Sequence, residues 1–173
     1  MLIRRDRPAD QSAVRAVLAE AFADPEAPQQ APVEVGLVDA LHGSSEWLPQ
    51  LSLVAEADGG AVVGYVVCTR GWVDDHPALG LGPLAVAPAA QRRGAGSALM
   101  HAVLGAADAL GEPLVALLGH TEYYPRFGFR PADQLGIAPP VAAWASHFQV
   151  RPLTSHEPQL RGTFRYAQPF DDL

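Results

Sequence analysis

The sequence predicts one α/β domain in which helices cover a single mixed sheet. Three observations support this prediction. The chain has 173 residues, which suffices for one hydrophobic core and leaves no comfortable room for a second. Hydrophobic residues make up 49% of the chain and charged residues 18%, a composition typical of globular proteins. Stretches with the two-residue period of strands alternate with stretches that have the 3.6-residue period of helices.

The first half of the chain predicts a strand, two helices and a hairpin. Pro8 marks the start of a helix whose apolar residues recur every three or four positions. A second, weaker helix ends at Gly43. Asp58–Gly60 then forms a tight turn between two strands. The predicted elements are a strand at Leu2–Arg5, helices at 8–22 and Pro32–Leu41, and strands at Leu51–Ala57 and Ala61–Arg70.

The second half predicts a long amphipathic helix between two strands and a strand-rich end. Gly111 and Pro113 end the long helix, whose apolar stripe includes Leu99, Val103 and Leu110. The expected elements after the Trp72–Pro77 loop are strands at Leu79–Ala87 and Leu114–Leu118, a short helix at Glu122–Arg126, a loop at Gly136–Pro140, and strands at Phe148–Leu153 and Gly162–Ala167. The resulting order is β-α-α-β-β-β-α-β-α-β-β.

Composition and charge restrict the binding partners and the cellular compartment that we expect. The net charge is −7 and every basic residue is an Arg, which argues against a nucleic-acid partner. No apolar run reaches the roughly 20 residues of a membrane helix, and no signal peptide is evident, so no membrane partner is expected. The single Cys68 permits no internal disulfide and favours a cytoplasmic location. The six His residues lack metal-ligand spacing, so no metal site is predicted.

The strongest functional signal lies in the stretch Leu84–Leu99, where a predicted strand ends, an Arg- and Gly-rich turn follows, and the long helix begins. The N–H groups at a helix N-terminus are unpaired and carry the positive end of the helix dipole, so they bind phosphate. Gly94 and Gly96 have no Cβ, which lets an anion approach the backbone. Arg92 and Arg93 add positive charge. The turn is therefore predicted to bind a phosphate-bearing ligand.

The turn resembles the coenzyme A signature of the GNAT family of N-acetyltransferases, Gln/Arg-x-x-Gly-x-Gly/Ala, here at Gln91–Gly96. A second motif, Glu122–Phe129, is similar to the family's Phe-Tyr-x-x-x-Gly-Phe segment and to the Tyr-Tyr-x-Arg-Phe-Gly-Phe segment of a small-substrate subgroup. The opening Ile3-Arg4 … Pro8-Ala9-Asp10 also matches. The resemblance implies a single GNAT-like acyl-CoA N-acyltransferase domain over residues 1–173, with a mostly antiparallel central sheet flanked by helices.

The resemblance also implies an activity, namely direct transfer of an acetyl group from acetyl-CoA to a primary amine without a metal. Tyr124 occupies the tyrosine position that protonates the departing thiolate in the family. The implied cofactor contacts are the backbone groups of Leu84, Ala85 and Val86 toward the pantetheine arm, and Arg92, Arg93, Gly94, Ala95, Gly96 and Ser97 around the pyrophosphate. A homodimer is a further expectation from the family.

Several alternatives remain open in the sequence. The family often places an Asn after the next strand, where this chain has His120 or Thr121 as substitutes. The amine must lose a proton to a general base, with Glu46, Asp74, Asp75, His76 and Glu122 as candidates, or to a water chain. Trp47, Trp72 and Trp144 either line the acceptor pocket or pack in the fold. Because no base stands out, a non-catalytic acyl-CoA-binding or sensing domain is the competing hypothesis. A nucleotide-binding regulator is disfavoured because no Lys follows Gly96.

Overall fold

The central sheet is mixed but mostly antiparallel. The computed structural model describes residues 1–172, and within them nine strands join in the order β1-β2-β3-β4-β5-β8-β6, with β9 beside β3 and β7. Only the β4–β5 and β7–β9 pairs are parallel among these described strands. The strands are β1 (Leu2–Arg5), β2 (Ser52–Glu56), β3 (Val62–Val73), β4 (His76–Val86), β5 (Leu114–Leu118), β6 (Arg130–Pro131), β7 (Ile137–Ala138), β8 (Phe148–Pro152) and β9 (Gly162–Arg165).

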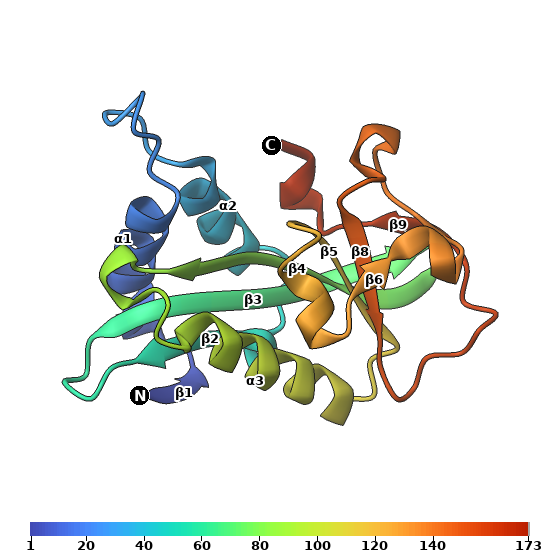
Figure 1. Cartoon of the computed structure of the whole chain (residues 1–173), viewed down its shortest axis with the longest axis horizontal. Helices are drawn as coiled ribbons and strands as arrows, with labels where there is room; N and C mark the ends of the chain where they lie inside the picture. Colours follow the sequence, from blue (N-terminus) through green and yellow to red (C-terminus); the bar gives the residue numbers. More distant parts are fainter. Residues whose placement is uncertain (173) are drawn as a thin grey trace.

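Helices cover both faces of this sheet. Helices α1 and α2 lie on one face and α3 lies on the other (Figure 1). None of the helices in residues 1–172 is long and apolar enough to cross a membrane. The helices that matter for the site are α1 (Gln11–Ala21), α2 (Val33–His42), α3 (Ala95–Ala109) and the short 3-10 helices η4 (Tyr124–Phe127) and η7 (Gln168–Asp172). The predicted single α/β domain with helices around a mostly antiparallel sheet is therefore confirmed.

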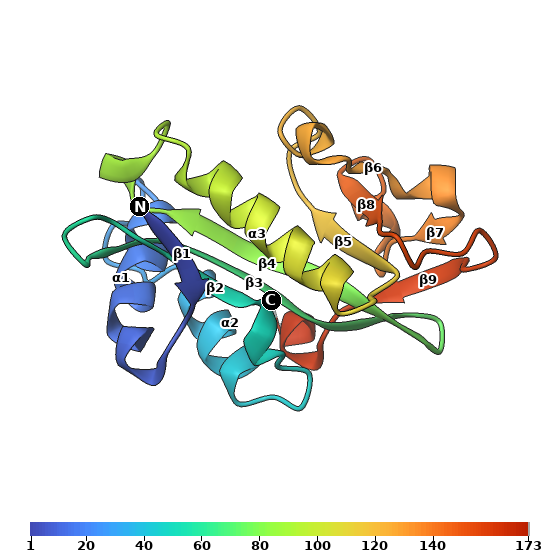
Figure 2. The ribbon, with the colours of Figure 1, turned by 90° about the horizontal axis from the view of Figure 1, so that it is seen from below.

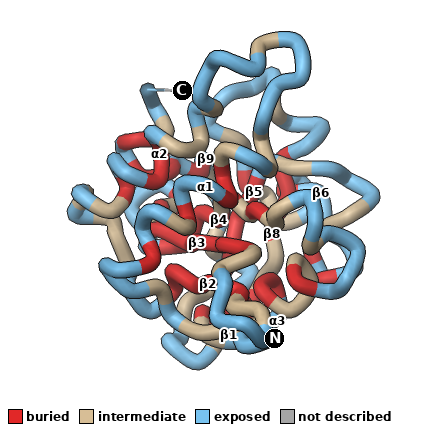
Figure 3. The backbone as a smooth tube through the Cα atoms, turned by 90° about the vertical axis from the view of Figure 1, so that its left-hand side faces the viewer, coloured by how far each residue is buried: buried red, intermediate tan, exposed pale blue. Residues whose placement is uncertain are grey.

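The two core layers follow from the two-residue period of the long central strand β3. Tyr65 and Val67 point into the cluster beneath α1 and α2, whereas Val66 and Cys68 point into the cluster beneath α3. All four side chains are completely buried. In Figure 3 the buried residues are concentrated in the middle of the sheet. A strand that is apolar on both faces explains the uninterrupted Val-rich run of β3.

A gap opens between β4 and β5, and it positions the site. These parallel strands pair only at Leu79–Val115 and Gly80–Ala116, near their beginnings. Beyond Gly80 the register between β3 and β4 shifts, because β4 carries an extra residue around Gly82 and Pro83. Pro83 has no N–H to donate to a neighbouring strand. Strand β5 instead pairs along its whole length with β8. The C-terminal ends of β4 and β5 therefore separate, as Figure 2 shows.

Three local predictions were wrong in ways that tertiary contacts explain. The expected loop at Gly136–Pro140 contains β7, which exists because its two residues pair with Gly162 and Thr163 of β9. The expected Trp72–Pro77 loop is mostly strand, because β3 and β4 pair up to a tight turn that leaves only residues 74 and 75 between them. The expected helix at Glu122–Arg126 is the single 3-10 turn η4, with Pro125 in its first positions.

Candidate active site

The turn between β4 and α3 leaves the N-terminus of α3 open. Arg92 and Gly94 have positive φ angles of 60° and 89°, which bend the chain sharply into the helix. The first helical hydrogen bond joins the Ala98 N–H to the Gly94 carbonyl. The N–H groups of the three preceding residues, 95–97, therefore lack a helical partner, and Gly94 at the N-cap position has no side chain to supply one. This geometry suits an anion.

A cavity of about 530 Å³ lies in front of this helix end, and we call it the anion pocket. Two guanidinium groups, those of Arg92 and Arg126, line it. The ion pairs of arginine within residues 1–172 involve Arg4, Arg15 and Arg70 instead, so both pocket arginines keep their charge free for a ligand. The complete lining is Leu84, Val86, Gln91, Arg92, Gly94, Gly96, Ser97, Tyr123 and Arg126.

The turn η4 forms the opposite wall of the anion pocket. The Arg126 guanidinium stacks over the Tyr123 ring at 4.6 Å, and its Nε donates a 2.8 Å hydrogen bond to the Tyr123 carbonyl. A Cβ placed on Gly96 would lie 3.2 Å from the Tyr123 hydroxyl, so the absence of a side chain at Gly96 keeps the pocket open. Sequence reasoning did not assign Tyr123 or Arg126 to this pocket. Their only signal was the motif at residues 122–129, which is separated from the glycine turn by all of α3 and β5.

The structure divides the predicted cofactor residues into two groups. Leu84, Val86, Arg92, Gly94, Gly96 and Ser97 line the anion pocket. The side chains of Ala85 and Ala95 are instead buried in the core, and Arg93 is an exposed residue that does not belong to the lining. Adjacent residues of a strand, or of a tight turn, point in different directions, so a contiguous segment cannot present every side chain to one cavity.

The backbone N–H and C=O groups of β4 also point in two different directions. The Ala87 N–H donates to the Val63 carbonyl of β3, so in this antiparallel ladder the N–H and C=O of Ala85 also point toward β3. The backbone groups of Leu84 and Val86 point the other way, into the gap left by β5. The Val86 carbonyl accepts a 3.0 Å hydrogen bond from Nε2 of Gln91. The backbone groups of Ala85 therefore point toward β3, whereas both backbone groups of Leu84 and the N–H of Val86 face the gap, where the pantetheine contact is predicted.

A second cavity of about 530 Å³ lies between the separated ends of β4 and β5, and we call it the apolar cleft. It meets the anion pocket at Leu84, which lines both cavities. Phe22, which follows the last residue of α1, and the helices α2 and η7 supply its far side. Its lining is Phe22, Val33, Glu34, Leu37, Leu81, Gly82, Pro83, Leu84, Leu118, Gly119, His120, Tyr124, Trp144, Tyr166 and Phe170.

Tyr124 stands in the wall of the apolar cleft. Its ring packs edge-on against Tyr123 and Phe129, with centroid distances of 5.0 and 5.8 Å. Gly119 permits this position, because any Cβ there would collide with the Tyr124 ring. Burial, with a smaller contribution from Tyr123, raises the pKa of Tyr124 to about 12. The phenol is therefore protonated throughout the physiological range and available as a proton donor.

Of the other residues that the sequence offered as candidates for the site, some line the apolar cleft and others lie elsewhere. His120 lines the apolar cleft and Thr121 does not. Asp74 is engaged in the fold, because its Oδ1 accepts a 2.9 Å hydrogen bond from the Thr163 N–H. Trp144 lines the cleft, whereas Trp47 stacks on His42 and Trp72 stacks on Arg165. Cys68 is fully buried, which raises the pKa of its thiol, so it is no nucleophile.

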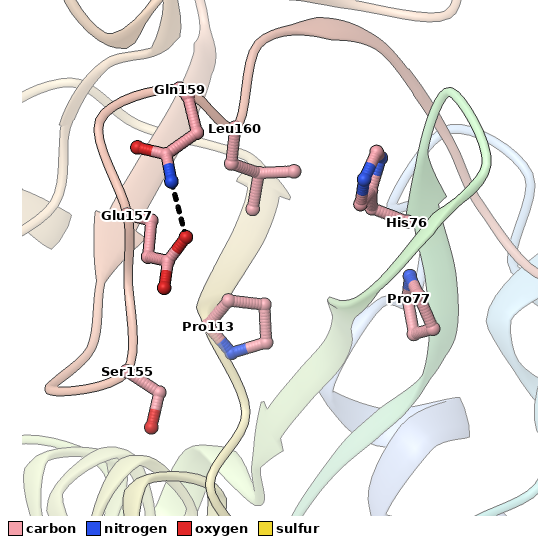
Figure 4. Close-up of a pocket in the computed structure, with 7 residues that line it drawn as sticks. All are labelled: His76, Pro77, Pro113, Ser155, Glu157, Gln159 and Leu160. Carbon is pink, nitrogen blue, oxygen red and sulfur yellow. Dashed lines mark hydrogen bonds between the residues drawn. The ribbon is translucent and has the colours of Figure 1, made fainter.

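A smaller cavity of about 230 Å³ lies at the other end of the strands, beside the beginnings of β4 and β5 (Figure 4). His76, one of the predicted bases, lines this cavity and not the cleft that holds Tyr124. The Glu157 carboxylate there accepts a hydrogen bond from Gln159. The cavity has no arginine and no open helix end in its lining, so it shares none of the features that suit a phosphate-bearing ligand.

The fold and the two joined cavities define a class of protein. An open helix end flanked by two arginines joins an apolar cleft at Leu84, so the two cavities can hold the phosphates and the acyl arm of one ligand. The acetyltransferase (GNAT) domain family matches residues 49–131. YjhQ of Escherichia coli K12, described as an uncharacterized N-acetyltransferase, is 35% identical over 144 residues, which cover 79% of each chain. The chain therefore belongs to the GNAT family of N-acetyltransferases.

Solved structures support this assignment. The GNAT family N-acetyltransferase YhbS of Escherichia coli, solved in complex with CoA, is 28% identical and superposes with a TM-score of 0.87, covering 98% of this chain and 91% of that one. A GNAT family acetyltransferase of Brucella melitensis, solved in complex with acetyl-CoA, is 30% identical with a TM-score of 0.76, covering 98% and 97% of the two chains.

Proposed function

We propose that this enzyme transfers an acetyl group from acetyl-CoA to a primary amine by direct attack of the amine on the thioester. The observation that carries the proposal is the junction of the two cavities at Leu84. A cofactor whose phosphates occupy the anion pocket passes its pantetheine arm along β4 and presents its thioester in the apolar cleft beside Tyr124. The CoA and acetyl-CoA complexes of the two similar proteins support the same choice of cofactor.

The pyrophosphate is held by charge and by backbone N–H groups together. Gly96 and Ser97 present unpaired N–H groups at the positive end of α3, and Arg92 and Arg126 approach from two sides of the pocket. The pocket thus provides locally the positive charge that a chain of net charge −7 lacks overall. Along β4 the outward-facing backbone groups of Leu84 pair with the amides of the pantetheine arm, as an added strand would.

The chemical step has a proton balance in which Tyr124 takes part. The bound ammonium first loses one proton to water, the neutral nitrogen then forms a bond to the acetyl carbon, and the resulting tetrahedral intermediate expels the CoA thiolate. Tyr124 gives its proton to the sulfur as the C–S bond breaks. A phenol with a pKa of about 12 does not stay ionised, so the phenolate regains a proton from the nitrogen, which became acidic when the C–N bond formed. The products are an amide and a neutral thiol, and the enzyme returns to its starting state.

Two measurements test this function together. Isothermal titration calorimetry with acetyl-CoA measures cofactor binding, and a thiol-trapping assay with a panel of amines measures turnover. We expect binding and amine-dependent thiol release. Binding without thiol release from any amine would support the competing hypothesis of a sensing domain, and the absence of both would refute the assignment of the anion pocket to the cofactor.

A further inference from the structure

The apolar cleft has a composition that specifies its substrate. We infer that the acceptor is a primary monoamine with an apolar, ring-sized carbon body, and that it enters the cleft as an ammonium paired with Glu34 before it loses one proton and attacks the thioester. This inference rests on the proposed function and names the substrate class of the same site. It depends on three features of the cleft, which are its aromatic wall, its lack of arginine side chains, and the unengaged carboxylate of Glu34.

The wall of the cleft is mainly aromatic and aliphatic. Phe22, Phe170 and Tyr166 come from helices and loops on one side, and Trp144 comes from the segment between β7 and β8. Large flat side chains around a cavity of about 530 Å³ favour a ligand with a ring or a compact hydrocarbon body. A peptide backbone would fit poorly, because each of its N–H and C=O groups needs a polar partner and this wall offers few.

The apolar cleft differs from the anion pocket in the charged side chains of its lining. No arginine lines the apolar cleft, and its titratable side chains within residues 1–172 are Glu34, His120 and two tyrosines. A substrate carboxylate or phosphate would have no arginine to pair with, which is costly inside an apolar cavity. A polyamine would bring further ammonium groups against the same apolar wall with a single carboxylate to pair them. The acceptor therefore carries one positive charge and no negative one.

Glu34 is placed to pair with that charge. It lies in the first turn of α2, where the positive end of the helix dipole favours a carboxylate, and it is half-buried at the edge of the cleft. The ion pairs and side-chain hydrogen bonds among residues 1–172 do not include it, whereas Asp39 of the same helix pairs with Arg15 at 3.1 Å. A half-buried carboxylate without a protein partner, facing an apolar cavity, is a suitable partner for a ligand ammonium.

A panel of acceptors tests the inference through thiol release from acetyl-CoA. 2-Phenylethylamine and tryptamine should have a kcat/KM at least about tenfold above phenylalanine, tryptophan, spermidine, kanamycin and a peptide with an N-terminal leucine. Phenylalanine and tryptophan are the matched probes, because they differ from the first two amines by a single carboxylate. If an amino acid, a polycation or the peptide is acetylated as efficiently as the aromatic monoamines, the inferred substrate class is wrong.

Variants of Glu34 test its role separately. Glu34→Gln should raise the KM for tryptamine about tenfold or more while leaving the dissociation constant of acetyl-CoA unchanged, and Glu34→Arg should reverse the preference toward tryptophan. Glu20→Gln removes the same charge from the exposed face of α1 and is the matched control, with no change expected. An unchanged KM in Glu34→Gln would overturn the pairing. Wild-type protein that binds acetyl-CoA and acetylates none of the amines would instead overturn the proposed function itself.

Discussion

The anion pocket and the apolar cleft have the same volume, about 530 Å³ each, and are built in opposite ways. Most of the anion pocket comes from one continuous segment, Leu84–Ser97, completed by two residues of the turn near η4. The apolar cleft draws on Phe22, α2, β4, β5, the Trp144 segment and the C-terminal η7. The first pocket supplies arginines and backbone N–H groups, whereas the second supplies rings and one carboxylate.

The difference shows which part of the enzyme can change its substrate. The anion pocket depends on backbone geometry at positions 92–97, where positive φ angles and a helix end leave few tolerated residues. The cleft depends on side chains from several separate elements, so a substitution of one lining side chain alters its shape or charge while the cofactor site stays intact. We therefore expect variants of the two cavities to separate cleanly into effects on cofactor affinity and effects on the acceptor.

The largest effect is expected for Gly96→Val. A side chain at this position would point toward the Tyr123 hydroxyl and Val86, into the space that the phosphates need, so acetyl-CoA affinity should fall at least about 100-fold. Gly105→Val is the matched control, because Gly105 lies on the same helix with open space around it. If calorimetry finds wild-type acetyl-CoA affinity in folded Gly96→Val, the cofactor does not bind in the anion pocket.

Tyr124→Phe should have the next largest effect. It keeps the edge-on packing against Phe129 and removes the proton donor, so kcat should fall about 100-fold with little change in cofactor affinity. Tyr123→Phe is the contrasting variant. The Tyr123 hydroxyl lies near Gly96 in the anion pocket, so its loss should weaken cofactor binding modestly and spare kcat. If Tyr123→Phe lowers kcat more than Tyr124→Phe does, then Tyr123 and not Tyr124 is the proton donor.

The pH dependence of kcat tests whether Tyr124 is the proton donor. Its pKa is raised to about 12, and the acid must be protonated to act, so ionisation of Tyr124 removes no activity below about pH 11. The kcat ratio of wild type to Tyr124→Phe should therefore stay constant from pH 7 to about pH 10. A ratio that declines across this range would show that the essential acid has a lower pKa than Tyr124.

Smaller effects are expected for the arginines of the anion pocket. Arg92→Gln and Arg126→Gln should each weaken acetyl-CoA binding about tenfold at low ionic strength and less at high salt, because both side chains are exposed. Arg93→Gln is the matched control and should change affinity less than about twofold, since Arg93 lies outside the lining. Equal losses in Arg92→Gln and Arg93→Gln would mean that general charge, and not the pocket, holds the cofactor.

The smallest effect concerns His42, which ties α2 to the N-terminal segment. Its Nε2 lies 3.1 Å from Asp6, and the hydrogen bond with that carboxylate is the main cause of the raised pKa of His42. A raised pKa in the folded state contributes stability that is fully present below about pH 6.5, the unfolded value, and is lost as the pH rises through the folded pKa.

Thermal unfolding checks this contribution. The melting temperature of wild type should exceed that of His42→Gln by more at pH 5.5 than at pH 9. The charge contribution is lost over this interval, whereas the lost packing against Trp47 affects both pH values equally. Acetyl-CoA affinity should stay unchanged, since α2 lines only the apolar cleft. A gap in melting temperature that does not depend on pH would show that the imidazole stays neutral beside Asp6.

The sequence by itself determined the order of the main helices and strands, without the short strands β6 and β7, together with the family, and it predicted the cofactor turn. Each of these is a local property, because helix and strand periods and the Gly94–Gly96 turn are encoded in adjacent residues. The position of Tyr124 also followed from a contiguous motif. Its role, like those of the other site residues, remains a prediction for the experiments above.

Only the tertiary structure decided which residues meet. Strand β7 exists through pairing with a distant strand, and Ala85 turns away from the cleft because β3 takes its backbone groups. Arg126 joins Arg92 only after α3 and β5 bring two distant turns together. Glu34 and Trp144 lie 110 residues apart in the sequence and have no pattern that links them. The gap between β4 and β5 places both on one cavity, because packing acts between surfaces and depends only indirectly on sequence order.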